Sequence, residues 1–362
     1  MTSSTAPKRR RPTVADVARE AGVSIASTGR ALGDYGYVSN DVRTAVLDAA
    51  KKLGYRPNSV ARSMRNGTTR TIGFVCSDIE SPFFSSVMRG IADIAHAAGY
   101  ETLLFNTDER IDAESAAVRV LLEKQVDGII VVPASVRESS HLEQAITQGT
   151  SVVLVDRAIP GLAADTVLSN NEDVAHAAVA HLTALGHRRV AVVASTSTTD
   201  RFGGFNMRAG LMRPRGPERP VTQRLNGYFR ALTEAGIDHD PELVKYSDAQ
   251  GELQDAVRSL LDLEDPPTAM FATDDRATKA MFRAVHDRRV RVPRAISIIG
   301  FDDLEWMQMV DPPLTAVVQP AYEMGQEAAR LLVTRLTDGE APPATYVLRA
   351  ELVHRRSVAA PK

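Results

Sequence analysis

The residues best suited to chemistry in this sequence are the basic ones of its first 70 positions. They hold 13 Lys and Arg against 5 Asp and Glu, whereas the remaining residues hold 30 against 40. A basic head on an acidic body is expected to bind a polyanion through the head alone. The run 8–11 by itself would be an ordinary solvated tail. The other basic residues, such as Arg30 at the end of the small-residue segment 24–30, belong to patterned helices.

Three short helices are expected to position these groups. Thr13 and Asp16 form a capping box at the start of the first helix, and Gly22 ends that helix. Ser24 caps the second helix. The third begins at Ser39 and ends at Gly54, and its expected buried stripe is Val42, Val46, Leu47, Ala50 and Leu53. Two short helices joined by a tight turn, with a third that completes a small core, match the helix-turn-helix pattern.

A further short helix is predicted over residues 58–65, after Pro57. Two turns are too few to be stable alone in water. Val60 and Met64 share one face of this helix, with Arg62 and Arg65 beside them. The segment therefore needs a partner, which could be its symmetry mate, DNA or both.

From residue 71 onward, short apolar runs alternate with amphipathic segments. The expected strands are 72–76, 102–105, 128–132, 152–155, 190–193, 269–272 and 296–299. The expected helices include 83–98, 113–126, 174–185 and 277–287. Continuous apolar runs are typical of strands buried on both faces, and the alternation predicts doubly wound parallel sheets in an α/β body. Two such sets indicate two lobes, with a ligand bound between them at the carboxyl ends of the strands.

Several classes of protein are disfavoured by what the sequence lacks. One cysteine, Cys76, rules out an internal disulfide framework, and no apolar run approaches the ~18 residues of a membrane span. The basic N-terminus has no apolar stretch after it, so a cytoplasmic protein is expected. No dinucleotide, P-loop or nucleophile-elbow motif is present, and His176 and His181 are wrongly spaced for a metal. We therefore expect no enzyme, cofactor or metal.

The sequence resembles the LacI/GalR family of bacterial transcription regulators. The resemblance is carried by TVADVAREAGVS and YVSNDVRTAVLDAAKKLGYRPNSVARSMRNGTTRTIGFV, and then by DGIIVVP, VDR, HLTALGHRRVAVV, RLNGYFRALTEAGI, ISIIGFDD and DPPLTAVVQP. It implies that the second helix enters the major groove of DNA. It also implies that the helix after the proline folds on the operator and inserts an apolar side chain into the minor groove.

The resemblance assigns DNA-binding roles residue by residue. Ile25, Ala26 and Arg30 take the base-reading positions. Arg30 is the best candidate for a bidentate hydrogen-bond contact to guanine. Other expected contacts to DNA are Ser24, Ser27, Tyr37, Arg43, Asn58, Ala61 and Met64. Met64 takes the wedge position, and Val60 the position where two hinge helices meet.

The reading helix departs from the family pattern at two positions. The family usually reads T-V-S-R where this chain has Ser27-Thr28-Gly29-Arg30. Thr28 replaces a buried valine, and Gly29 weakens a helix by roughly 1 kcal/mol relative to alanine.

The resemblance also assigns an effector pocket, with the residues Phe83, Phe84, Asp156, Arg157, Arg224, Asp248, Asp274 and Asp302. Carboxylates accept hydrogen bonds from hydroxyls, arginine donates them, and an aromatic covers an apolar ring face, so a small polyol fits. Asp156, Asp274 and Asp302 make the pocket acidic, so an amine-bearing ligand is the alternative. Each residue also has a structural alternative: the phenylalanines as plain core, Asp274 and Asp275 as helix caps, Asp302 and Asp303 as an Asx turn, and Arg224 as a surface ion pair.

The expected domain limits follow from the strand and helix pattern together with the same resemblance. Residues 1–12 are an arm, 13–57 the helix-turn-helix, and 58–70 the hinge and linker. The first lobe takes 71–166 and 320–340, and the second takes 167–318 and 341–358. The chain is expected to cross between lobes near 166, 297–300 and 319. The stretch 195–223 is longer than in relatives and is interpreted as a surface loop beside the cleft, either a tolerated insertion with no role or a lid that folds over the effector.

The expected function is a ligand-responsive, sequence-specific DNA-binding regulator, most simply a repressor. It would bind a palindromic operator as a homodimer and respond to a sugar-like effector. The alternatives are a transport-type sugar-binding protein, which has no use for the basic head, and an enzyme on the same two-lobed fold, which lacks a catalytic motif.

Overall fold

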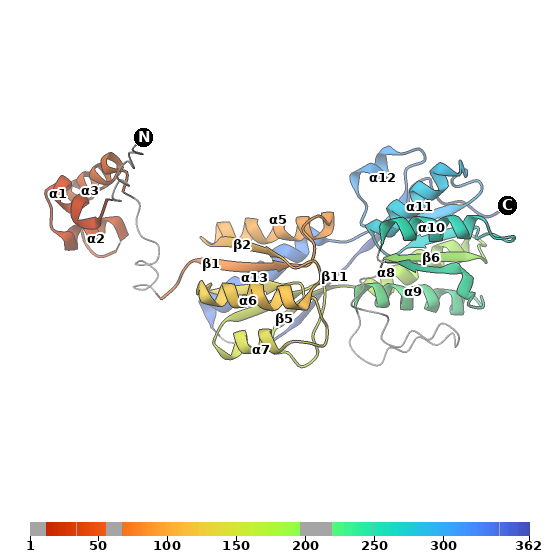
Figure 1. Cartoon of the computed structure of the whole chain (residues 1–362), viewed down its shortest axis with the longest axis horizontal. Helices are drawn as coiled ribbons and strands as arrows, with labels where there is room; N and C mark the ends of the chain where they lie inside the picture. The colour runs from red at the N-terminus through yellow and green to blue at the C-terminus, as the bar shows by residue number, and fades with distance from the viewer. Residues whose placement is uncertain (1–11, 34, 56–66, 196–218, 248, 340) are drawn as a thin grey trace, which may run out of the picture. The chain divides into compact units, whose positions relative to one another are not determined.

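The computed structural model describes residues 12–33, 35–55, 67–195, 219–247, 249–339 and 341–362. The chain divides into two compact units, Met1–Arg70 and Thr71–Lys362 (Figure 1).

The first unit contains three helices, α1 (Val14–Ala21), α2 (Ile25–Gly33) and α3 (Asn40–Leu53). The predicted capping box is present: the Asp16 backbone N–H donates to Thr13 Oγ1, and the Thr13 N–H donates to Asp16 Oδ2. Gly22 and Gly54 end α1 and α3 at φ values of 65° and 64°. These left-handed conformations explain why glycine stands at both positions.

The three helices enclose a small core of Val17, Ala31, Val46, Ala49 and Ala50. The prediction of a buried Leu47 was wrong, because this side chain is 50% exposed. Leu47 follows the fully buried Val46 by one position, which on a helix of 3.6 residues per turn rotates it about 100° away from the core.

The second unit begins with a sheet of six parallel strands in the order β11-β5-β4-β3-β1-β2. The strands are β1 (Thr71–Cys76), β2 (Glu101–Asn106), β3 (Gly128–Val131), β4 (Ser151–Val155), β5 (Asp165–Ser169) and β11 (Thr345–Leu348). Helices α5 (Pro82–Ala97) and α13 (Ala321–Asp338) pack on one face, and α6 (Ile111–Glu123) and α7 (Ser140–Thr147) on the other. This sheet and its helices form the first lobe.

The second lobe has a six-stranded sheet in the order β12-β10-β9-β8-β6-β7, in which β12 alone is antiparallel to its neighbour. The strands are β6 (Val190–Ser195), β7 (Val244–Ser247), β8 (Ala269–Ala272), β9 (Ser297–Phe301), β10 (Thr315–Val318) and β12 (Glu351–Val353). One face is covered by α8 (Asn171–Ala184) and α9 (Pro220–Glu234), the other by α10 (Gln250–Leu261) and α11 (Asp275–Asp287). The short η2 (Pro241–Leu243) and α12 (Glu305–Met309) complete the lobe. The doubly wound architecture is the one that the sequence predicts.

The two lobes are joined at three crossings, and two of them differ from the prediction. The chain leaves the first sheet after β5, re-enters the first lobe between β10 and α13, and leaves it again between β11 and β12. Near residue 319 the chain passes from β10 to α13. The one predicted near 166 lies about four residues later, and residues 297–300 are not a crossing because they belong to the buried strand β9. Residues 345–348, assigned to the second lobe from the sequence, extend the sheet of the first, since edge strands carry too little pattern to reveal their sheet.

Close packing of α8 against α9 brings the starts of the two helices together. A Cβ at Gly227 of α9 would lie 2.2 Å from the carbonyl oxygen of Glu172 of α8, so only glycine allows this approach. The contact places Asn171, the first residue of α8, beside the second turn of α9.

None of the helices in the part of the chain that the structure describes has the length and apolar character of a membrane span. The same residues contain no group of three or more His, Cys, Asp or Glu side chains arranged to hold a metal ion.

Candidate functional site

The exposed face of α2 carries the residues expected to read bases. Ile25 is 61% exposed, and Ser24 and Ala26 are exposed beside it. Ser24 caps the helix as predicted, because its Oγ accepts from the Ser27 N–H at 3.0 Å. Tyr37, in the segment between α2 and α3, is 90% exposed, and Arg43 at the start of α3 is half-buried. The helix therefore presents an apolar tip, at Ile25, at its N-terminal end.

The departures at Thr28 and Gly29 have a structural explanation. Thr28 is fully buried and its hydroxyl donates to the Ser24 carbonyl at 3.0 Å, so threonine fills the valine position with its polar group satisfied. A Cβ at Gly29 would lie 3.5 Å from the Tyr35 hydroxyl oxygen, which is ordinary contact. The glycine leaves the middle of the reading helix without a side chain but does not distort it.

Arg30 lies folded along its own helix. Its Nε donates to the Ala26 carbonyl at 3.4 Å, and its Cδ is 3.3 Å from the point where a Cβ at Gly36 would stand. A long contact of this kind is weak, so the side chain can turn outward toward a base at little cost. The other predicted DNA contacts, Asn58, Ala61 and Met64, and the predicted hinge contact Val60 lie outside the described residues.

In the second unit, two aspartates follow parallel strands in the same unusual conformation. Asp156 follows β4 at φ 70°, and Asp302 follows β9 at φ 72°. Aspartate tolerates this left-handed region better than most residues. Each strand end thus turns sharply and presents a carboxylate, where ligands of open α/β sheets bind.

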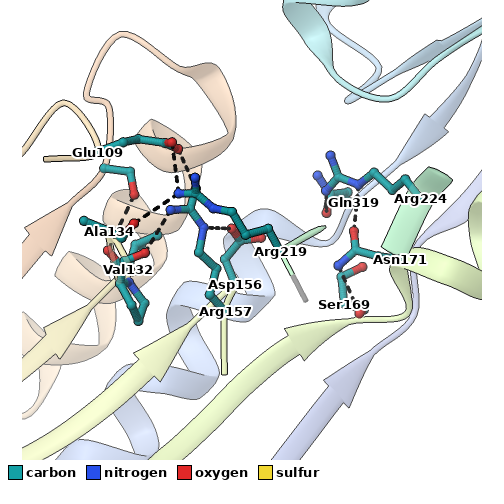
Figure 2. A network of polar contacts seen from close by, with 12 residues as sticks. Glu109, Val132, Ala134, Asp156, Arg157, Ser169, Asn171, Arg219, Arg224 and Gln319 are labelled. Atoms are coloured by element: carbon teal, nitrogen blue, oxygen red, sulfur yellow. Dashed lines mark hydrogen bonds and ion pairs between the residues drawn. The ribbon is translucent and has the colours of Figure 1, made fainter. Parts of the chain in front are cut away.

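Asp156 belongs to a charged cluster of the first lobe (Figure 2). The neighbouring Arg157 donates from Nη1 to the Pro133 carbonyl at 2.8 Å and from Nη2 to Glu109 Oε1 at 2.5 Å. Its Nε lies 3.4 Å from Asp156 Oδ2. Arg157 is therefore held by carboxylates on two sides, and its side chain is only 7% exposed.

Arg219 brings a second guanidinium to the same cluster. It stands at the N-terminus of α9 in the second lobe, yet its Nη2 donates to Glu109 Oε2 at 3.0 Å and to the Ala134 carbonyl at 3.2 Å, both in the first lobe. The Glu109 carboxylate is thus shared between two arginines, one from each lobe (Figure 2).

Arg224 lies one and a half turns further along α9 and has neutral partners. Its Nε donates to Asn171 Oδ1 (2.8 Å), Nη1 to the Thr273 carbonyl (2.7 Å) and Nη2 to Gln319 Oε1 (3.1 Å). Its Cζ lies 4.0 Å from the centre of the Phe301 ring, within cation–π range. Asn171 and Gln319 stand at two of the crossings, so Arg224 ties both crossing segments to α9.

The third crossing is fastened beside the first. Asn170 Oδ1 accepts from the Ala350 N–H at 2.7 Å, and the Asn170 N–H donates to the Leu348 carbonyl. The three connections between the lobes therefore meet around the first residues of α8.

The carboxylates near Arg224 have separate environments. Asp302 Oδ1 accepts from Gln319 Nε2 at 2.6 Å, whereas Asp303 is held by both outer nitrogens of Arg355. Asp274 caps α11: its Oδ1 accepts from the Ala277 N–H, and its Oδ2 accepts from the Ser195 N–H and the Thr273 hydroxyl. The capping alternative considered for Asp274 is correct, although a capped carboxylate can still accept from a ligand.

Burial changes the acidity of this group. It raises the pKa of the Asp156 carboxyl above its usual range, against the opposing charge of Arg157. It raises the pKa of Asp302 to about 6, against the opposing charge of Arg224 and the hydrogen bond from Gln319. Burial lowers the pKa of Arg224, while Asp302, Asp156 and Asp274 raise it. The two acids and Arg224 therefore share one electrostatic environment, as expected of a binding site.

Phe83 and Phe84 occupy the first turn of α5, at the same edge of the first sheet. They are 9% and 8% exposed, belong to the hydrophobic core and pack edge to face with ring centres 5.1 Å apart. Their environment is that of core residues, the alternative that the sequence left open. Asp248, the remaining effector candidate, lies outside the described residues.

Two parts of the chain match known families. Residues 13–58 match the family described as bacterial regulatory proteins, lacI family, and residues 179–358 match the periplasmic binding protein-like domain. Catabolite control protein A of Priestia megaterium is 34% identical over 346 residues, which cover 95% of this chain and 97% of the relative. The regulator RegA of Clostridium saccharobutylicum is 33% identical over 345 residues, which cover 95% and 98%. This chain belongs to the LacI family of bacterial regulatory proteins.

Solved structures agree with that membership of the LacI family. The regulator CelR in complex with cellobiose is 29% identical, with a TM-score of 0.68 and coverage of 96% of this chain and 100% of that chain. A LacI-family regulator from Enterococcus faecium with bound ribose is 28% identical, with a TM-score of 0.67 and coverage of 81% and 100%. The lac repressor dimer bound to operator, at 23% identity, has the same fold over 97% of this chain and 100% of that chain, with a TM-score of 0.81. The curated relatives are transcriptional regulators, and this LacI-family chain is a regulator rather than an enzyme.

Sequence reasoning missed four residues of the polar cluster. Glu109 and Arg219 form the bridge between lobes, and Asn171 and Gln319 hold Arg224. Gln319 could have been found as a polar residue at a predicted crossing. Glu109 and Arg219, 110 positions apart, carried no signal in the sequence.

Proposed function

We propose that this LacI-family regulator is a repressor that binds a palindromic DNA operator as a homodimer and responds to a small hydroxylated effector, a sugar or sugar derivative. The observation that carries the DNA-binding part is the exposed face of α2 in a region that matches the LacI-family DNA-binding domain. Two such helices in a symmetric dimer would fit successive major grooves.

The polar cluster supports an uncharged effector. The cationic groups of Arg157, Arg219 and Arg224 are already matched by carboxylates or by neutral acceptors. A ligand with its own net charge would upset that balance, whereas hydroxyls can both donate and accept. The sugar-bound neighbours point the same way, since one holds cellobiose and another ribose.

One buried hydroxyl also favours a polar ligand. Ser169, at the end of β5 beside Asn171, is 5% exposed, and its Oγ has no hydrogen-bond partner among the described residues. An unpaired polar group at a binding edge calls for a partner, and a ligand hydroxyl would supply one.

Selection from a random duplex library tests the DNA-binding part. The wild-type full chain should enrich a palindromic sequence. Arg30→Ala should weaken binding to that sequence more than binding to random duplex, because a base contact carries specificity and a phosphate contact does not. Equal losses on both duplexes would reject a base-reading role for Arg30.

A thermal-shift screen tests the effector part. Cellobiose, ribose and a panel of other neutral sugars and nucleosides should include a compound that raises the unfolding temperature of the wild-type chain by mass action. Stabilisation by charged sugar acids alone would contradict the neutral-effector proposal.

A further inference from the structure

The guanidinium of Arg219 reaches from one lobe into the other. Arg219 is the residue before Pro220, the first residue of α9 in the second lobe. Its partners Glu109 and Ala134 follow β2 and β3 of the first sheet, and its side chain is only 8% exposed. This contact is part of the fold rather than a loose surface pair.

The ion pair in this contact uses a shared carboxylate. Glu109 Oε1 accepts from Arg157 and Oε2 accepts from Arg219 (Figure 2). Arg157 is itself fixed to the Pro133 carbonyl. With both guanidiniums below a tenth exposed, water competes poorly for them and the ion pairs are stronger than surface pairs.

Helix α9 connects this contact to the crossings. Arg224, five residues after Arg219 and so about 7.5 Å further along the helix axis, bonds to Asn171 and Gln319 at two crossings. Helix α9 therefore contacts the first lobe at its N-terminus, through Arg219. About one and a half turns later it contacts the connecting segments, through Arg224.

We propose that Arg219 and Glu109 form a latch that holds the two lobes at a fixed separation, and that α9 links this latch to the effector arginine Arg224. Any motion that separates the lobes at this edge must break the ion pair. Only its use in effector control rests on the proposed function; the latch itself is a property of the fold.

Distance measurements between the lobes in the full chain test the latch. Spin labels on Lys124→Cys in the first lobe and Glu264→Cys in the second use two exposed positions. The single native thiol, Cys76, is buried, and burial raises its pKa to about 11, so it stays unlabelled. The chain with Arg219 intact should give one dominant inter-lobe distance. Arg219→Met should add a second population at longer distance.

The matched control is Arg230→Met on the same helix. Arg230 pairs with Glu172 and Asp173, both within the second lobe, at 2.6 and 3.0 Å. This variant should keep the wild-type distance. Arg219→Lys, which keeps the charge, should restore most of the dominant population.

Glu109→Gln sharpens the test because the carboxylate is shared. Arg219→Met leaves Glu109 paired with Arg157, whereas Glu109→Gln removes the carboxylate that both arginines share, while Asp156 stays 3.4 Å from Arg157. Glu109→Gln should therefore populate the longer distance at least as strongly as Arg219→Met. The double variant should exceed Glu109→Gln alone by no more than the loss of the hydrogen bond from Arg219 to Ala134, since both single changes break the same ion pair.

The latch is overturned if Arg219→Met and Glu109→Gln leave the distances unchanged, or if Arg230→Met changes them equally. If Arg219→Met does not fold cooperatively, Arg219→Gln, which can still donate to Ala134, replaces it. A wild-type chain that enriches no duplex would reject the proposed function, while the distances would still decide the latch.

Discussion

Each lobe places an aspartate in the same local conformation after a strand. The arginine nearby has charged partners in the first lobe and neutral partners in the second. Asp156 and Asp302 each follow a buried strand with φ near 70°. In the first lobe the adjacent arginine, Arg157, is held by the carboxylates of Glu109 and Asp156. In the second lobe Arg224 is held by amide and carbonyl oxygens and an aromatic ring, with Asp302 acting without a direct bond.

The difference indicates that the two halves of the polar cluster have different roles. In the first lobe Arg157 pairs with Glu109 and Asp156, and Glu109 also pairs with Arg219 of the second lobe. This half of the polar cluster serves to fix the lobes. In the second lobe the neutral acceptors of Arg224 lie beside the Asp302 carboxylate, and the hydroxyls of an uncharged ligand can donate to or accept from such groups. Loss of Arg224 would leave three acceptors unpaired, whereas loss of Arg157 leaves Glu109 paired with Arg219, so the second lobe should be the more sensitive to mutation.

The largest effect is expected for Arg224→Met. It leaves Asn171, Gln319 and the Thr273 carbonyl without their donor and removes the cation that opposes the buried Asp302. We expect a loss of about 4 kcal/mol in the free energy of unfolding of the second unit. Denaturant unfolding followed by circular dichroism measures it. Arg230→Met, with half-exposed partners, is the control and should cost less than about 1 kcal/mol.

A smaller loss is expected for Arg157→Met, about 2 kcal/mol by the same measurement. Glu109 keeps Arg219 as a partner, and Asp156, whose pKa is already raised by burial, can take up a proton. If Arg157→Met lowers the free energy of unfolding as much as Arg224→Met does, the expected difference between the lobes is contradicted.

The pH dependence of stability should show the raised pKa of Asp302. The folded chain holds this proton more tightly than the unfolded chain, whose pKa is near 3.8. The contribution of the Asp302 proton to the free energy of unfolding is therefore full below about pH 4 and is lost as the pH rises through about 6. Asp302→Asn should remove a downward slope of about 1–2 kcal/mol over that window, since one pKa unit is worth ~1.4 kcal/mol and the side chain keeps some solvent contact. Parallel pH profiles for wild type and Asp302→Asn would contradict this.

The smallest effect is expected for Ser169→Ala. Because its hydroxyl has no protein partner among the described residues, removing it should change the free energy of unfolding by less than about 0.5 kcal/mol. Ser357→Ala is the matched control: Ser357 is fully buried, donates to the Ile298 carbonyl at 2.6 Å and accepts from the Thr315 N–H, so its loss should cost about 1–2 kcal/mol. A destabilising Ser169→Ala would show a structural partner for this hydroxyl.

Much of the fold could be predicted from local patterns. The capping box of Thr13, the glycine stops at Gly22 and Gly54 and the doubly wound alternation all appear as expected. The errors concern features that local pattern does not encode. Residues 345–348 were assigned to the wrong lobe, and β9 was mistaken for a crossing.

The candidate site was predicted in part. Asp156, Arg157, Arg224, Asp274 and Asp302 come together in the second unit, but the sequence could not say which of them were already bonded within the protein. Phe83 and Phe84 lie in the core, and Asp274 caps a helix. Motif likeness identifies a position without its surroundings, which depend on partners brought from distant segments.

The sequence by itself determined the central strands of both sheets and the caps of α1 and α2, because each depends on residues within a turn or a strand of one another, and its motifs determined the family. Only the tertiary structure decided how charge is shared. Glu109 meets Arg219, 110 positions away, and Arg224 meets Gln319, 95 positions away. Such pairings arise from the packing of whole lobes, since a buried cation must find an acceptor wherever the fold places one.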